Sequence, residues 1–187
     1  WPSVSPNTDR HDWAAAATRL LLAGASLCVF VLGQAAAAAR LPPLPESARI
    51  LAFGDSLTGG VGGVGESYPS DLARLIRREV INAGLPGQTT ADGRRRLLLV
   101  LQEERPDLLI LCMGINDFLQ GVPRGKVRAN LLAMLEMARE ANVPVLLLAI
   151  PARGEALADP LFAEVAVQGG AVIDERAMIE TLVRADL

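Results

Sequence analysis

Short apolar runs alternate along the chain with segments in which apolar residues recur every three or four positions. Strands buried on both faces of a parallel sheet are apolar nearly throughout, whereas helices covering such a sheet are apolar on one side. The pattern therefore predicts an α/β fold of three α/β/α layers around a parallel five-stranded sheet. The expected strands are residues 49–53, 79–82, 107–113, 144–150 and 170–174, and the expected helices are residues 67–78, 90–105, 123–142 and 175–184.

Prolines mark the boundaries of two expected helices. Pro106 ends the helix at 90–105, and Pro123 suits the first turn of the helix at 123–142. Apolar side chains at helical spacing are expected to point inward: Leu72, Leu75 and Ile76 in the first helix, and Leu97, Leu98 and Leu101 in the second.

The N-terminal part has the pattern of a targeting segment. Residues 20–32 are continuously apolar, Arg10 and Arg19 precede them, and an alanine run at 35–39 follows. This order predicts a secretory signal peptide over residues 1–39, with an uncleaved membrane anchor as the alternative. Residues 40–48 are rich in proline and are predicted to form a stiff linker. A domain over residues 49–187 is expected to follow. The expected location is periplasmic or secreted, with membrane association through the N-terminal segment in the anchored case.

Composition excludes several classes of function. Of the 187 residues, 51% are hydrophobic and 21% charged, and the net charge is −3, which argues against a nucleic-acid-binding protein. The two cysteines cannot form a disulfide framework, and no Cys/His cluster has the spacing of a metal site. We therefore expect neither a metal nor a cofactor.

Three polar segments follow the first three expected strands: Gly-Asp-Ser-Leu with Ser56, Asn-Ala-Gly with Gly84, and Gly-Ile-Asn-Asp with Asn116. Carboxyl ends of parallel strands meet at one edge of a sheet, where ligands bind. There Ser56 can act as a nucleophile, while the Gly84 N–H and the Asn116 amide can donate hydrogen bonds to an oxyanion. Each residue alone also fits an ordinary turn or helix cap.

In this order, the segments resemble those of the SGNH hydrolases, also called the GDSL esterase/lipase family. The chain looks closest to the bacterial branch of secreted arylesterases, lysophospholipases and acyl thioesterases. The resemblance implies a flavodoxin-like sheet, Ser56 as the nucleophile, and an oxyanion hole made by the Ser56 N–H, Gly84 and Asn116. Asp55 and Asp117 would support these residues. The implied reaction is hydrolysis of a small or lipid-like carboxylic ester or thioester through an acyl-serine intermediate.

One part of the family pattern is missing. The family's Asp-x-x-His block supplies the base, but no histidine follows Ser56, and the single histidine, His11, lies in the targeting segment. The simplest interpretation is truncation before that block, with loss of the final helix. Asp174 is read as structural. Without a base, serine is a poor nucleophile, so we expect this chain to be nearly inactive and a full-length parent to be active.

Other functions stay open. Residues 60–65 match the dinucleotide pattern G-x-G-x-x-G, but the glycines do not directly follow a strand, and Asn82 stands where that motif has an acidic residue. A non-catalytic domain that binds esters or carbohydrates would keep the pocket without the base. A fragment unable to fold stably is the third alternative.

Overall fold

The computed structural model describes residues 40–60, 67–152 and 156–184. The predicted targeting segment, residues 1–39, lies outside this part of the chain, as does most of the glycine-rich run at 60–65. Within the described ranges, no helix combines the length and the apolar character needed to cross a membrane.

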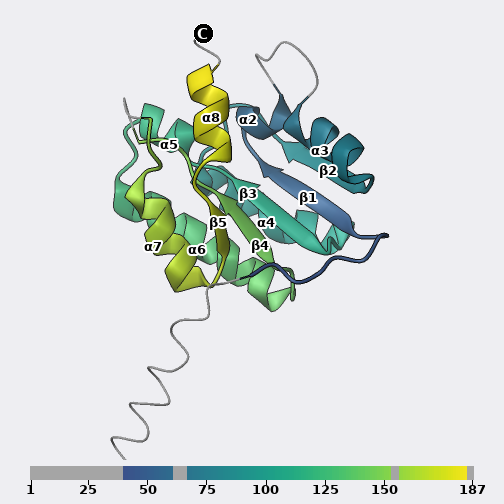
Figure 1. Cartoon of the computed structure of the whole chain (residues 1–187). Coiled ribbons are helices and arrows are strands. Elements are labelled where there is room, and N and C mark those ends of the chain that lie inside the picture. Colours follow the sequence, from purple (N-terminus) through teal and green to yellow (C-terminus); the bar gives the residue numbers. More distant parts are fainter. Residues whose placement is uncertain (1–39, 61–66, 153–155, 185–187) are drawn as a thin grey trace, which may run out of the picture. The chain divides into compact units, whose positions relative to one another are not determined.

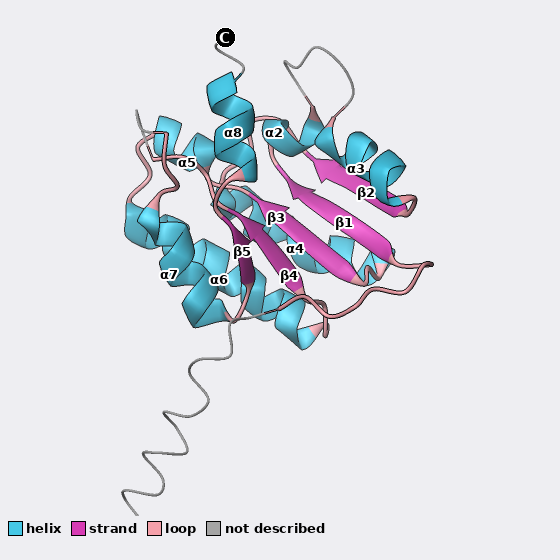
Figure 2. Ribbon diagram, in the orientation of Figure 1, coloured by secondary structure: helices cyan, strands magenta, loops and turns pink. Residues whose placement is uncertain are grey.

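A five-stranded parallel sheet forms the centre of the fold (Figures 1 and 2). Its strand order is β2-β1-β3-β4-β5, and every neighbouring pair is parallel. This confirms the predicted α/β class and the flavodoxin-like sheet. The strands are β1 (Arg49–Gly54), β2 (Glu79–Gly84), β3 (Leu108–Cys112), β4 (Val145–Leu148) and β5 (Val172–Asp174).

The expected helices are all present, and in the described part of the chain three further helices occur that the sequence pattern did not predict. The expected ones are α3 (Tyr68–Ile76), α4 (Thr90–Glu104), α6 (Arg124–Glu140) and α8 (Ala177–Arg184). The additional ones are α2 (Ser56–Gly59), α5 (Ile115–Leu119) and α7 (Pro160–Gly169). A local signal for α7 was available, because Asp159 caps it through a bond from the Leu161 N–H and Pro160 occupies its first turn.

Two contacts show that helices cover both faces of the sheet. Residues in register on parallel strands share a face, so Phe53 and Leu111 lie on one face, and Gly54 and Cys112 on the other. The Arg96 guanidinium of α4 lies over the Phe53 ring, whereas Met178 of α8 contacts the Cys112 thiol. Helices α4 and α8 therefore lie on opposite faces, and α6 packs between α4 and α7.

The buried side of α4 is narrower than the sequence predicts. Leu97 and Leu101 are buried as expected, but Leu98 is 47% exposed. Consecutive helical residues point about 100° apart, so Leu98 lies at the border of the face set by Leu97. Leu75 of α3 was also expected inside and is 78% exposed. Both expectations were wrong because helical spacing shows which side of a helix is apolar, but not how much of that side is covered by the rest of the protein.

The proline-rich segment 40–48 packs against the body of the fold. Leu41 and Leu44 contact the core, and Ala48 is buried. The Arg78 side chain donates to the carbonyl oxygens of Leu44 and Pro45, at 3.1 and 3.0 Å. These contacts hold the segment along the molecule immediately before β1.

Candidate active site

The three predicted segments meet at one edge of the sheet. Gly54 pairs with Gly84 on one side and with Cys112 on the other, so β1, β2 and β3 end level with one another. Ser56, the loop after β2 and the start of α5 follow these ends within a few residues. The structure therefore brings together the residues that the sequence placed after separate strands, as expected for an open parallel sheet.

Ser56 is the first residue of α2, a single helical turn that begins directly after β1. It is half-buried, and within the described ranges neither its hydroxyl nor its N–H has a hydrogen-bond partner. The first N–H groups of a helix have no partner inside the helix. The Ser56 N–H is thus available to a negatively charged oxygen that forms beside the Ser56 hydroxyl.

Asp55 caps α2 and is completely buried. One carboxylate oxygen accepts from the Leu57 N–H at 3.0 Å, whereas Oδ2 is buried without a partner among the described residues. Burial, with a smaller contribution from the charge of Asp117, raises the pKa of Asp55 to about 6. Asp55 therefore caps α2, and burying its carboxylate there costs free energy because the charge is removed from water.

Gly84 lies where predicted, but its N–H is already used. It donates to the Asn82 side-chain oxygen at 3.0 Å, and the Asn82 amide donates to the Ser67 hydroxyl. A Cβ at Gly84 would lie 2.2 Å from the backbone nitrogen of Gly59. The glycine is thus required for close approach of β2 to α2, and its N–H would have to leave Asn82 to reach a ligand.

Gly87 is a second candidate donor that the sequence analysis did not single out. It has φ +77°, and no atom of the described residues lies within 4 Å of the position of a Cβ. Its N–H has no partner among the described residues. The following carbonyl, that of Gln88, accepts from the Asn116 side-chain amide at 2.9 Å. The Pro86-Gly87 dipeptide, a common turn signal, was the available hint.

Asn116 and Asp117 lie on α5, directly after β3. Asn116 is partly buried, and its bond to Gln88 joins α5 to the loop after β2. Asp117 is fully buried and accepts from the Thr90 N–H and the Thr90 hydroxyl, both at 2.7 Å. The predicted bracing role of Asp117 thus has a definite form, which is attachment of α5 to the start of α4.

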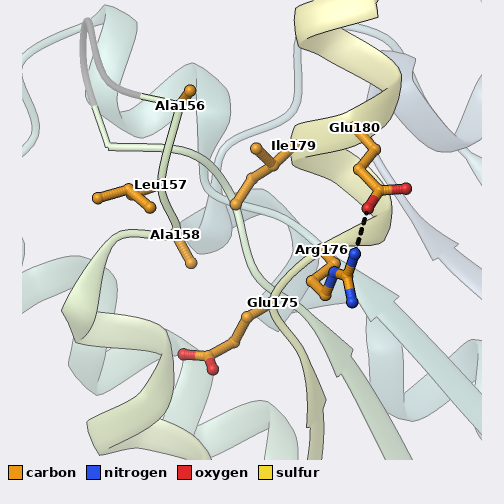
Figure 3. A pocket seen from close by; sticks show the side chains of 7 residues that line it. All are labelled: Ala156, Leu157, Ala158, Glu175, Arg176, Ile179 and Glu180. Atoms are coloured by element: carbon orange, nitrogen blue, oxygen red, sulfur yellow. Dashed lines mark hydrogen bonds and ion pairs between the residues drawn. The ribbon is translucent and has the colours of Figure 1, made fainter.

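A cavity of about 540 Å³ lies between the loop before α7 and the start of α8 (Figure 3). It is at the same end of the sheet, beyond β4 and β5. Arg176 and Glu180 form an ion pair along one wall. The other lining residues are Ala156, Leu157, Ala158, Glu175 and Ile179.

Asp174 has a structural use in the fold. Its Oδ1 accepts from the N–H groups of Arg176 and Ala177, at 2.9 and 2.7 Å, which caps α8. His11 lies outside the described residues. Among residues 40–60, 67–152 and 156–184, no group of three or more His, Cys, Asp or Glu side chains could hold a metal ion.

Comparison with known proteins places the chain in a family of lipases and acylhydrolases. The family model of the GDSL-like lipase/acylhydrolases matches residues 52–177. Esterase TesA of Pseudomonas aeruginosa is 33% identical over 138 residues, covering 71% of this chain and 64% of TesA. The arylesterase of Vibrio mimicus is 32% identical over 110 residues, covering 56% of this chain and 55% of that enzyme. The chain thus spans somewhat more than half the length of these curated relatives.

The solved structures agree with the sequence comparison. AlinE4, an esterase of the SGNH-hydrolase family, superimposes with a TM-score of 0.65 at 34% identity, covering 75% of this chain and 81% of AlinE4. The family match includes all three segments that meet at the sheet edge. On these grounds the chain belongs to the GDSL-like lipase/acylhydrolase family of ester hydrolases.

Proposed function

We propose that this domain hydrolyses carboxylic esters or thioesters through an acyl-Ser56 intermediate. One observation carries the proposal: Ser56, whose N–H at the start of α2 has no partner among the described residues, lies at the sheet edge where Asn116 is bonded to the loop after β2. A nucleophile and converging neutral donors are the arrangement that stabilises a tetrahedral oxyanion.

The reaction follows from these groups. The Ser56 hydroxyl oxygen attacks the carbonyl carbon while its proton passes to a base, and the carbonyl oxygen becomes an oxyanion. The Ser56 N–H, the Asn116 amide and a backbone N–H of the loop after β2 bind that oxyanion. Collapse expels the alcohol or thiol, which takes up the proton, and water then hydrolyses the acyl-serine ester to restore the hydroxyl.

Two glycines are candidates for the third donor. Gly84 was predicted from the sequence, but it would have to release Asn82 Oδ1 first. The Gly87 N–H has no bond to break within the described part of the loop, and Gly87 precedes the residue that Asn116 contacts. We therefore favour Gly87, with Gly84 as the alternative.

The base is the part that these 187 residues do not supply after Ser56. We propose that this polypeptide turns over esters very slowly, and that an added base restores the reaction. Loss of the histidine or serine of a serine-protease triad costs roughly 10⁶-fold in turnover. Imidazole added to the solution has the chemistry of the absent side chain.

The test is imidazole rescue with a short-chain p-nitrophenyl ester. Imidazole cleaves such esters by itself, so the informative quantity is the rate of the chain minus that of its Ser56→Ala variant. We expect this difference to rise with imidazole concentration. Asn116→Ala should lower it by about 10²–10³-fold, because it removes an oxyanion donor. Asn142→Gly is the matched control, since Asn142 follows α6 and already has φ +58°.

Equal rates for the chain and Ser56→Ala at every imidazole concentration would refute the serine mechanism. Saturable binding of the ester without serine-dependent cleavage would instead favour the non-catalytic binding domain.

We propose that the cavity between the loop before α7 and α8 holds one side of the substrate. Leu157, Ala158 and Ile179 give it an apolar wall suited to an acyl chain. Like Ser56, it lies beyond the carboxyl ends of the strands, the edge at which ligands of such sheets bind, and this supports a place for it in the substrate site. Small-molecule and lipid-like esters are therefore the proposed substrates.

We also propose that residues 1–39 are a targeting segment that directs the domain to the periplasm or the exterior. The apolar stretch flanked by arginines and alanines supports this. N-terminal sequencing of the protein recovered from each cell fraction tests it. Cleavage within the alanine run, after Ala37 or Ala39, in protein found outside the cytoplasm would agree, whereas an intact cytoplasmic chain would contradict it.

A further inference from the structure

Arg96 of α4 reaches the site in a way that none of its neighbours does. Its guanidinium carbon lies 3.8 Å from the centre of the Phe53 ring, on the face of the sheet that α4 covers. From there it donates to the carbonyl oxygens of Gly54 and Ala83, at 3.0 and 2.8 Å, and to the Gln88 side-chain oxygen at 2.6 Å. One planar side chain thus contacts three separate segments.

Each acceptor adjoins a group of the proposed oxyanion site. Gly54 ends β1 and precedes Asp55 and Ser56, while Ala83 is followed by Gly84 at the end of β2. Gln88 follows Gly87 along the loop after β2, and its own carbonyl accepts from Asn116. The nucleophile and every candidate donor are therefore attached within a few bonds to the Arg96 guanidinium.

No carboxylate of the described residues neutralises the charge of Arg96. Within the described part of the chain it forms no ion pair, and all its hydrogen-bond acceptors are neutral. The adjacent Arg95 instead pairs with Asp92 on the surface. A half-buried guanidinium without a counter-ion is costly, so its position calls for a functional explanation. Its positive charge lies at the edge where the oxyanion would form.

We propose that Arg96 is a positioning residue that fixes the ends of β1 and β2 and the loop after β2 in the geometry that binds the oxyanion. The inference rests on the proposed function of Ser56. It predicts that loss of the guanidinium slows turnover more than it weakens substrate binding, because misplacement by about 1 Å costs on the order of 10²-fold in rate.

Kinetics with imidazole rescue test this directly. We expect Arg96→Met, which keeps the alkyl stem, to lower the Ser56-dependent kcat by about 10²-fold and to change KM less than about twofold. Arg96→Lys keeps the charge without the fork of donors and should recover about tenfold of that loss. Arg95→Met is the matched control on the same helix turn and should leave kcat unchanged.

A second control separates positioning from stability. Leu101→Ala removes a buried side chain of α4 away from the site and should lower Tm strongly. Measured well below its Tm, it should retain kcat. An Arg96→Met variant whose kcat falls no further than that of Leu101→Ala would overturn the proposal.

Amide hydrogen exchange tests the positioning role of Arg96 without requiring catalytic turnover. The Leu85 N–H donates to the Gly54 carbonyl, which is also an acceptor of Arg96. Arg96→Met should accelerate exchange of this amide by about tenfold or more, since a bond from a charged donor is lost beside it. Arg95→Met should leave it unchanged. Equal Leu85 exchange in the two variants would refute the positioning role.

Imidazole-rescue kinetics and hydrogen exchange together distinguish failure of the esterase proposal from failure of the positioning role of Arg96. If the unaltered chain shows no Ser56-dependent turnover, the proposed function fails, and exchange of Leu85 then tests only whether Arg96 fixes the ends of β1 and β2. If turnover is rescued but Arg96→Met behaves like Arg95→Met, the esterase proposal stands and the positioning role is refuted.

Discussion

Replacing Asp55 with asparagine should change how the stability of this fold depends on pH. Asp55 is fully buried, and one of its carboxylate oxygens has no partner among the described residues. Burial and the charge of Asp117 raise its pKa from 3.8 to about 6. Asparagine is an equally good N-cap, so it can still accept from the Leu57 N–H while carrying no charge.

The sign follows from proton binding. Between about pH 4 and 6 the native state keeps the proton on Asp55, whereas the unfolded chain has released it. The native state therefore binds more protons, and this carboxyl lowers the free energy of unfolding as the pH rises. A shift of about 2 pKa units corresponds to about 3 kcal/mol, which is fully expressed only above about pH 7.

Urea unfolding at pH 4, 5, 6 and 7 measures the effect. The informative quantity is the free energy of unfolding of Asp55→Asn minus that of the unaltered chain. Packing and capping differences do not depend on pH, so they cancel when this difference is compared between pH values. We expect it to increase by about 2 kcal/mol from pH 4 to pH 7, because a small part of the effect is already present at pH 4, just above the unfolded pKa of 3.8. A difference that stays constant or decreases over this range would refute the argument that burial destabilises the charged form.

Two further predictions concern Gly84 and Gly87, and each is paired with a second substitution for comparison. Gly84→Ala should destabilise the fold by about 3 kcal/mol, because its Cβ would meet the backbone of Gly59, whereas Gly125→Ala has open space at a helical position and should stabilise it by about 0.5 kcal/mol. Thermal unfolding checks both, and equal Tm values for the two variants would contradict the packing argument. Gly87→Ala should destabilise the fold by only about 1 kcal/mol, the strain of alanine at φ +77°, but should lower the imidazole-rescued rate by about 10²-fold because that strain displaces the loop. Asn82→Ala, which releases the Gly84 N–H, should leave that rate unchanged, and a rate increase would instead identify Gly84 as the donor.

The strands were predictable because burial on both faces leaves a continuous apolar run in the sequence. Residues 107–113 and 144–150 contain β3 and β4 for this reason. The additional helix α7 was missed although Asp159 and Pro160 form a standard helix start. The exposed Leu98 was placed inside because helical periodicity defines the centre of a buried stripe better than its borders.

The sequence by itself determined the fold class, the order of elements and the edge at which Ser56 and Asn116 meet. These follow from local patterns, because an apolar run forms a buried strand and a polar turn directly after a parallel strand lies at the carboxyl edge of the sheet. Sequence also established the family, through three segments in a single order, and showed that no histidine follows Ser56.

Only the tertiary structure decided which groups at that edge are free to act. Gly84 and Gly87 are both glycines in one loop sequence, yet the N–H of Gly84 is held by Asn82. Arg95 and Arg96 are adjacent and identical in type, but only Arg96 faces the strand ends where its three acceptors meet. Hydrogen bonds between segments distant in sequence depend on how helix and sheet pack, and one-dimensional patterns carry no record of that packing.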